Sequence, residues 1–145
     1  MGYNIYIGEA VLWKEELSGF YSSRVYEMSL PEAPSFSGDP LSNNKNARYP
    51  SYHGWHEFVE KVKLKDFFFD KDCGLMRTHP GCFLLKESHL KKIKETKTDW
   101  IEKHPNTVPG FMDPKFDNVL ARLIWLEFWI EWSLNNCKNP GIFNI

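Results

Sequence analysis

The stretch ARLIWLEFWIEW, residues 121–132, sets three tryptophans, a phenylalanine and four larger aliphatic residues beside one arginine and two glutamates. So much apolar surface in a helical pattern is typical of a helix that is buried on most sides. Charged and polar residues interrupt the longer apolar run from Val119 to Leu134, so the run is unlike a membrane span. We therefore predict that this helix is the centre of the fold and that the protein has no membrane partner.

Arg122 needs a partner that its own helix does not provide. At about 100° per residue, it lies roughly 140–180° away from Glu127 and Glu131, which would face solvent or a partner. Because a buried guanidinium without a counter-charge is costly, another part of the molecule must meet it. Three partners stay open: an acid or backbone carbonyl of another element, an anionic ligand held by a bidentate fork, or a partner chain. The candidate acids lie around the DFFFD segment and are Asp66, Asp70 and Asp72.

Strand patterns occupy the N-terminal part. YNIYI, residues 3–7, alternates with Tyr3, Ile5 and Ile7 on one face, which indicates a strand that EAVLWKEE could continue past a bend at Gly8. LSGF, residues 17–20, supplies a turn, and SRVYEMSL, residues 23–30, has the composition of a second strand. These segments predict a β-hairpin or short meander.

Helical patterns follow. Ser51 is a suitable N-cap for a helix whose apolar stripe is Trp55, Phe58, Val59 and Val62. Residues 86–104 predict an amphipathic helix with a solvated lysine face, stopped by a proline at 105. The Asp113–Pro114 pair is a start signal for the last helix, which would run to about residue 138.

The fold class that we predict is α+β. A small N-terminal antiparallel sheet, a hairpin or meander, would pack against about three helices, with the C-terminal helix central. The 145 residues would form a single domain, 1–145, interrupted by a long irregular loop over 31–50 that is rich in Pro, Ser, Asn and Gly. Residues 77–85, RTHPGCFLL, would form a second, compact loop.

Charge, cysteine content and the first residues of the sequence bear on the class of partner and on the cellular compartment. The net charge of −1 and pI near 6.5 argue against long nucleic acid as a partner. Three cysteines form an odd number without framework spacing, which favours reduced thiols in the cytoplasm. The opening MGYNIYIGEAVLW lacks the basic and apolar regions of a secretory signal, so we expect a cytoplasmic protein.

Two segments carry the polar and aromatic residues that a ligand site needs, ARYPSYHGWH at 47–56 and MRTHPGC at 76–82. Interleaved cations and aromatics suit stacking on a base and contact with a phosphate, although they also suit loops pinned to a core by tyrosines. We predict a pocket where both segments meet the last helix, with arginines on an anion, aromatic rings stacking and histidines donating. Its residues would be Arg48, Tyr52, His53, Trp55, His56, Arg77, His79, Arg122 and Trp129.

Metal and catalytic signals are weaker. Histidines at 53, 56 and 79 and cysteines at 73 and 82 could supply zinc ligands, but no C-x-x-C pair is present, so we predict neither metal nor cofactor. A nucleophilic pair of Cys82 and His79 is conceivable, and a tight turn whose histidine caps a neighbouring helix is the alternative. No catalytic residue is assigned.

Four blocks, MGYNIYIGEA, YPSYHGWHEFVEKV, GLMRTHPGC and VLARLIWLEFWIEW, resemble small bacteriophage and bacterial proteins that open Met-Gly-Tyr and run straight into a strand. The resemblance implies a phage or prophage setting inside a bacterial cell. It brings no activity and no catalytic residue.

Three functions stay open. The first is a phage-type binding protein, without catalysis, that captures a small anionic or nucleotide-like ligand. The second is an interaction module, homo-oligomeric or inhibitory toward a host protein, in which the surplus of aromatic residues forms an interface. The third is a hydrolase that uses His79.

Overall fold

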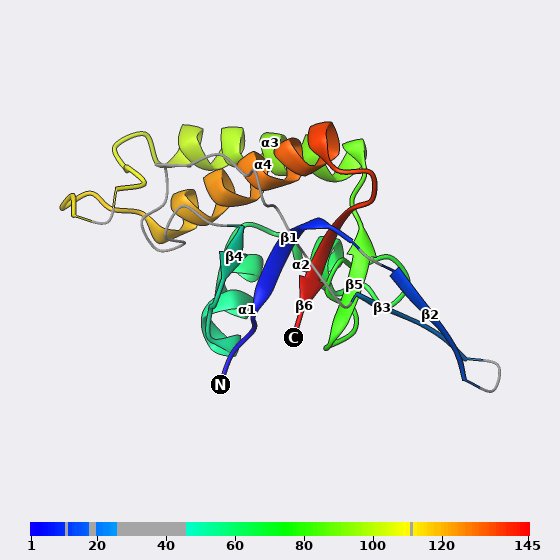
Figure 1. Ribbon diagram of the computed structural model, residues 1–145. Coiled ribbons are helices and arrows are strands. Elements are labelled where there is room, and N and C mark those ends of the chain that lie inside the picture. The colour runs from blue at the N-terminus through cyan, green and yellow to red at the C-terminus, as the bar shows by residue number, and fades with distance from the viewer. Residues whose placement is uncertain (11, 18–19, 26–45, 111) are drawn as a thin grey trace.

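The computed structural model describes residues 1–10, 12–17, 20–25, 46–110 and 112–145 (Figure 1). Its strands are β1 (Ile5–Glu9), β2 (Leu12–Leu17), β3 (Phe20–Val25), β4 (Ala47–Arg48), β5 (Gly81–Leu84) and β6 (Pro140–Asn144). Its helices are α1 (Tyr52–Lys61), α2 (Lys65–Phe69), α3 (Glu87–Lys103) and α4 (Asn118–Asn136). The α+β class is confirmed.

The main sheet is antiparallel, with strand order β4-β1-β6-β5. Ile7 of β1 lies opposite Ile142 of β6, and both are fully buried together with Ile5 on the face that α4 covers. The two ends of the described chain therefore pair at the centre of the sheet (Figure 1). The sheet is thus more than the N-terminal unit that we predicted. The predicted hairpin is confirmed in a separate two-stranded sheet, where β2 pairs with β3 in antiparallel fashion and Leu17 lies opposite Phe20.

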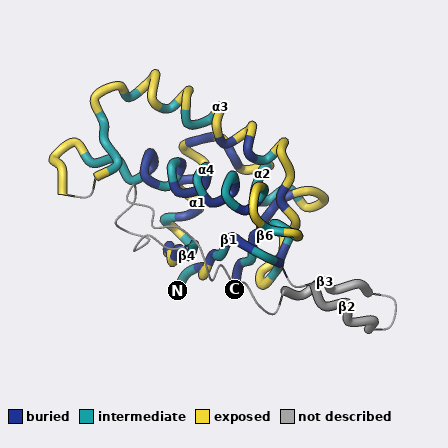
Figure 2. Tube along the Cα trace, turned by 45° about the horizontal axis from the view of Figure 1, so that its top comes forward, coloured by how far each residue is buried: buried dark blue, intermediate teal, exposed yellow. Residues whose placement is uncertain are grey.

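Helix α4 is central, as predicted. The sheet contacts it on one side, and α3 runs along it in the opposite chain direction (Figure 1). The outer side of α3 is exposed, whereas most of α4 is buried or half-buried (Figure 2). Its buried residues are Val119, Leu120, Ala121, Leu123, Trp125, Leu126, Trp129, Ile130 and Ser133.

Two ion pairs join α3 to α4. Nζ of Lys97 lies 2.5 Å from Oε2 of Glu127, and Nζ of Lys94 lies 3.1 Å from Oε1 of Glu131. The lysine face of α3 is therefore solvated only in part, because two of its lysines cover the acidic stripe of α4.

Helix α1 follows its local signals. The Ser51 side chain accepts a hydrogen bond from the backbone N–H of Gly54, which confirms the predicted cap. The apolar stripe of Trp55, Phe58, Val59 and Val62 is buried, also as predicted. Most of the following DFFFD segment forms α2, which buries Phe68.

Two predictions of local structure are wrong. The last helix begins at Asn118 rather than at Asp113, because Asp117 caps it and Asp113 accepts a hydrogen bond within a turn of its own. Residues 81–84 form a strand, since they pair with β6. Residues 140–144, which follow the predicted end of the last helix and for which we made no prediction, form β6.

The predicted loop over 31–50 lies outside the described residues as far as position 45, as do residues 26–30 of the second predicted strand. From Asn46 onward the chain is described, and it forms β4 beside β1. No helix in the described part of the chain is long and apolar enough to cross a membrane.

Candidate functional site

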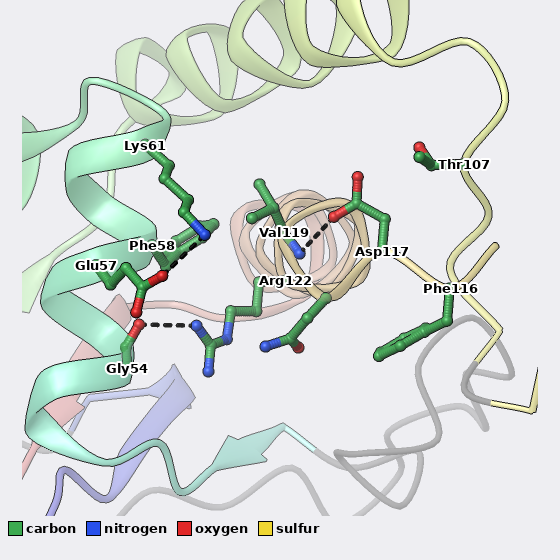
Figure 3. Close-up of a pocket in the computed structure, with 10 residues that line it drawn as sticks. Gly54, Glu57, Phe58, Lys61, Thr107, Phe116, Asp117, Val119 and Arg122 are labelled. Carbon is green, nitrogen blue, oxygen red and sulfur yellow. Dashed lines mark hydrogen bonds and ion pairs between the residues drawn. The ribbon is translucent and has the colours of Figure 1, made fainter. Parts of the chain in front are cut away.

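A cavity of about 300 Å³ lies between α1, the first turns of α4 and the loop that precedes α4 (Figure 3). Figure 3 shows Arg122 reaching from α4 toward α1, while Thr107 and Phe116 stand on the side of the loop. The lining residues are Gly54, Glu57, Phe58, Lys61, Thr107, Phe116, Asp117, Asn118, Val119 and Arg122.

Arg122 meets a backbone carbonyl. Its Nη1 donates a hydrogen bond of 2.9 Å to the carbonyl oxygen of Gly54 in α1. The guanidinium carbon also lies 5.9 Å from the ring centroid of Trp55 and 5.6 Å from that of Phe58, so the cation rests against aromatic rings. A backbone carbonyl was one of the partners that the sequence left open.

Asp70, one of the three candidate acids around the DFFFD segment, bonds elsewhere. The Oδ1 atom of Asp70 accepts hydrogen bonds from the backbone N–H groups of Asp72 and Cys73, at 2.8 and 3.0 Å. Asp70 therefore closes its own turn, and none of the three candidate acids lines the cavity.

Lysine and arginine set the electrostatics on the α1 side of the cavity. Lys61 pairs with Glu57 at 2.8 Å, and both side chains are about half exposed. The hydrogen bond from Lys61 is the main cause that lowers the pKa of Glu57, and Arg122 adds a smaller contribution. The Glu57 carboxylate is thus held as an anion between two cations.

The α4 side of the cavity presents the helix cap. The Oδ1 atom of Asp117 accepts from the backbone N–H groups of Val119 and Leu120, and its Oδ2 accepts from the indole of Trp100 at 2.7 Å. Three uncharged N–H donors thus bond this carboxylate. Beside it, the Oδ1 atom of Asn118 is buried and has no hydrogen-bond partner among the described residues.

Of the residues predicted for one pocket, Tyr52 and His79 lie in contact. The Tyr52 hydroxyl hydrogen-bonds Nε2 of His79 at 3.1 Å. The Nδ1 atom of His79 lies 2.6 Å from Oδ1 of Asn144, a buried residue of β6 that the sequence did not single out. Nearby, Nε2 of His56 bonds the hydroxyl of Tyr3 at 2.9 Å.

The other predicted residues are scattered. Trp55 and Trp129 are fully buried in the core, so neither ring offers a face to a ligand that arrives from solvent. Arg48 is also buried, with its guanidinium carbon 5.7 Å from the Trp125 ring centroid. Arg77 is exposed; it donates to the carbonyl of its own turn and lies over a phenylalanine ring.

Helix α1 lies between the cavity beside Arg122 and the polar cluster that contains Tyr52 and His79. Tyr52 and His56 project from one side, and Gly54 and Lys61 project roughly 160–200° away from Tyr52. His53 is exposed and pairs with Glu57 at 3.4 Å. His56 lines a different cavity of about 280 Å³, and none of the predicted residues except Arg122 lines the cavity of Figure 3.

The described residues do not form a metal site, and they do not pair Cys82 with His79 as a nucleophile and its base. No group of three or more His, Cys, Asp or Glu side chains there could hold a metal ion. Burial raises the pKa of Cys82 to about 12, so this thiol is protonated at neutral pH. Both ring nitrogens of His79 bond Tyr52 and Asn144, so neither is directed at Cys82.

Comparisons with known proteins give no functional information about the site. No protein family, curated protein or solved structure matched the chain with significant similarity.

Proposed function

We propose that the protein binds a small ligand with an anionic group in the cavity beside Arg122. The observation that carries the proposal is the position of this half-buried arginine at the wall of a cavity of about 300 Å³. Guanidinium groups bind carboxylate and phosphate oxygens through paired N–H donors. A volume at the low end of the usual range for ligand sites favours a ligand no larger than a mononucleotide.

The remaining wall favours a ligand with more than one kind of polar group. Asn118 also lines the cavity, and an amide side chain can exchange hydrogen bonds with a base amine or a sugar hydroxyl. Phe58 and Phe116 give the cavity an apolar surface against which a ring can pack. Mononucleotides combine these features with an anionic phosphate, so they are the first ligands to test.

Thermal unfolding with added ligand tests the proposal. Inorganic phosphate, nucleoside monophosphates and cyclic mononucleotides are added at millimolar concentration, and the melting temperature is compared with that of the free protein. A ligand at 100 times its Kd should add about 2.7 kcal/mol to the free energy of unfolding. If none of these ligands raises the melting temperature, the proposal fails.

A matched pair of arginine variants assigns the binding to the cavity. Arg122→Gln should abolish the ligand-induced shift, and Arg77→Gln should retain it. The two arginines are comparable, since each donates a 2.9 Å hydrogen bond from Nη1 to a backbone carbonyl and lies over an aromatic ring. Each shift is measured against the same variant without ligand. A shift that survives in Arg122→Gln would place the ligand elsewhere.

A further inference from the structure

A second polar cluster lies on the opposite side of α1 from the cavity. Tyr52 at the start of α1, His79 in the loop before β5 and Asn144 in β6 form a hydrogen-bonded chain, with separations of 3.1 and 2.6 Å. Tyr52 is half-buried and His79 is exposed, whereas Asn144 is fully buried. The chain thus runs from the core to a surface that solvent reaches.

The hydrogen bonds of Asn144 fix the tautomer that the neutral ring of His79 adopts. The Nδ2 atom of Asn144 donates to the backbone carbonyls of Thr78 and Gly81, at 3.0 and 3.4 Å. Its Oδ1 is therefore the atom that faces His79, and Nδ1 of the imidazole must donate to it. In the neutral ring Nε2 then carries the lone pair, so the Tyr52 hydroxyl is the donor in its bond to His79.

Tyr3 holds the two reacting side chains in place. Its ring packs edge-on against Tyr52 and His79, with centroids 4.7 and 4.9 Å apart. Tyr3 itself is buried, and its hydroxyl is bonded to His56. Packing on one side and Asn144 on the other thus limit the rotamers of the pair, as a reactive site requires.

We propose that Tyr52 is an activated nucleophile that accepts an acyl group from an activated ester. A hydroxyl, an imidazole that accepts its proton and a third group that orients the imidazole are the recurring parts of nucleophilic sites. Tyr52 supplies the first and His79 the second. Asn144 is the positioning residue, because it acts only through His79.

The acyl transfer balances without any further reactant. The Tyr52 oxygen bonds to the ester carbonyl carbon while its proton moves to Nε2 of His79. The bond between that carbon and the leaving oxygen then breaks, and the leaving phenolate departs with the electron pair. The imidazolium releases its proton to water or to the phenolate, which leaves an acyl ester on Tyr52.

The test uses p-nitrophenyl acetate on the intact protein, with acetylation of each tyrosine followed by peptide mass spectrometry. Tyr49 is the internal control, since it is 66% exposed and lies three residues from Tyr52. Base assistance should make acetylation of Tyr52 at neutral pH at least roughly tenfold faster than that of Tyr49. Acetylation of Tyr52 at or below the rate of Tyr49 would overturn the proposal.

Two variants separate activation from simple exposure. His79→Gln should bring the rate at Tyr52 down to that of Tyr49 and leave Tyr49 unchanged; because His79 is exposed, the loss of its ring should spare the core. An unchanged rate in this variant also overturns the proposal.

Asn144→Asp tests the positioning role of Asn144 through the pH profile of Tyr52 acetylation. A carboxylate beside Nδ1 stabilises the imidazolium form of His79. The decrease of the Tyr52 rate in acid should therefore begin at higher pH than in the wild type. A profile that does not move in a folded Asn144→Asp variant contradicts the role of Asn144.

Discussion

The indole of Trp100 in α3 donates a 2.7 Å hydrogen bond to Oδ2 of Asp117, the residue that caps α4. The other carboxylate oxygen accepts from the first backbone N–H groups of α4. One side chain thus both starts the central helix and ties it to the helix that covers it. The same carboxylate lies at the wall of the cavity.

Asp117→Ala should therefore cost more stability than the loss of a cap alone. The missing cap costs about 1 kcal/mol, and the indole N–H that loses its acceptor costs about 1 kcal/mol more. Urea unfolding, followed by tryptophan fluorescence, measures the change. Asp113→Ala is the matched control and should cost less than about 0.5 kcal/mol, because Asp113 is exposed and its carboxylate accepts a hydrogen bond within its own turn. Equal losses of stability in the two variants would mean that the hydrogen bonds of Asp117 do not stabilise the fold more than those of Asp113.

The start of α4 shows where local sequence signals reach their limit. Asp113–Pro114 and Asp117 are both plausible caps, and the proline makes the first one the stronger local signal. The choice is made by tertiary contacts, namely the bond from Trp100 and the burial of the residues after Asp117. The start of α1 was predictable because Ser51 and the apolar stripe are local signals that agree with the tertiary packing.

The two ion pairs between α3 and α4 should differ in strength. The side chains of Lys97 and Glu127 are 27% and 19% exposed, against 46% and 45% for Lys94 and Glu131. Because solvent screens the second pair more, a double-mutant cycle should give a coupling of about 1 kcal/mol for the first pair and less than about 0.5 kcal/mol for the second. Methionine for lysine and glutamine for glutamate keep the size of each side chain. A larger coupling for the exposed pair would contradict this order.

Strands β5 and β6 could not be recognised from their own residues. Each is short, and each becomes a strand because it pairs, β6 with β1 and β5 with β6. The same limit applies to the polar clusters. Arg122 stood out because the acids of its helix lie on the opposite face, whereas Asn118 and Asn144 carry no signal in the sequence that separates them from the other asparagines.

His89 should make the protein less stable in mildly acidic solution. Burial, and to a smaller extent the charge of Lys86, lowers the pKa of His89 below its usual value. Its Nδ1 accepts a hydrogen bond from the backbone N–H of Lys86 at 2.9 Å, which requires the neutral ring. Between the lowered pKa and the usual value of about 6.5, the unfolded chain binds a proton that the folded chain does not, so stability falls as the pH falls through this range.

Urea unfolding at pH 7 and at pH 5.5 measures this loss. His89→Gln should reduce it, because glutamine can accept the same backbone hydrogen bond without titrating. His53→Gln is the control and should leave the loss unchanged, since the His53 side chain is 91% exposed. A pH dependence that is the same in the wild type and in His89→Gln would remove His89 as its source.

Cys73 should react with a thiol reagent more slowly than its exposure alone predicts. Cys73 is exposed, but its Sγ–H donates to the carboxylate of Asp70 at 3.3 Å, and this bond is the main cause that raises the pKa of Cys73. Since only the thiolate reacts, Cys73 should react with a maleimide more slowly than a free cysteine at the same pH. Burial raises the pKa of Cys82 to about 12 and that of Cys137 to about 11, so both should stay unmodified until the protein unfolds.

Asp70→Asn should make Cys73 react several times faster. The asparagine oxygen can still accept the two backbone N–H groups that close the turn, so the substitution removes the charge and keeps the geometry. Asp72→Asn is the matched control and should change the rate little, because Asp72 acts on the thiol only as a more distant charge. Mass spectrometry of the labelled peptides gives the rate at each cysteine. If Asp70→Asn and Asp72→Asn accelerate Cys73 equally, the general negative charge of the turn, and not the hydrogen bond to Asp70, controls this thiol.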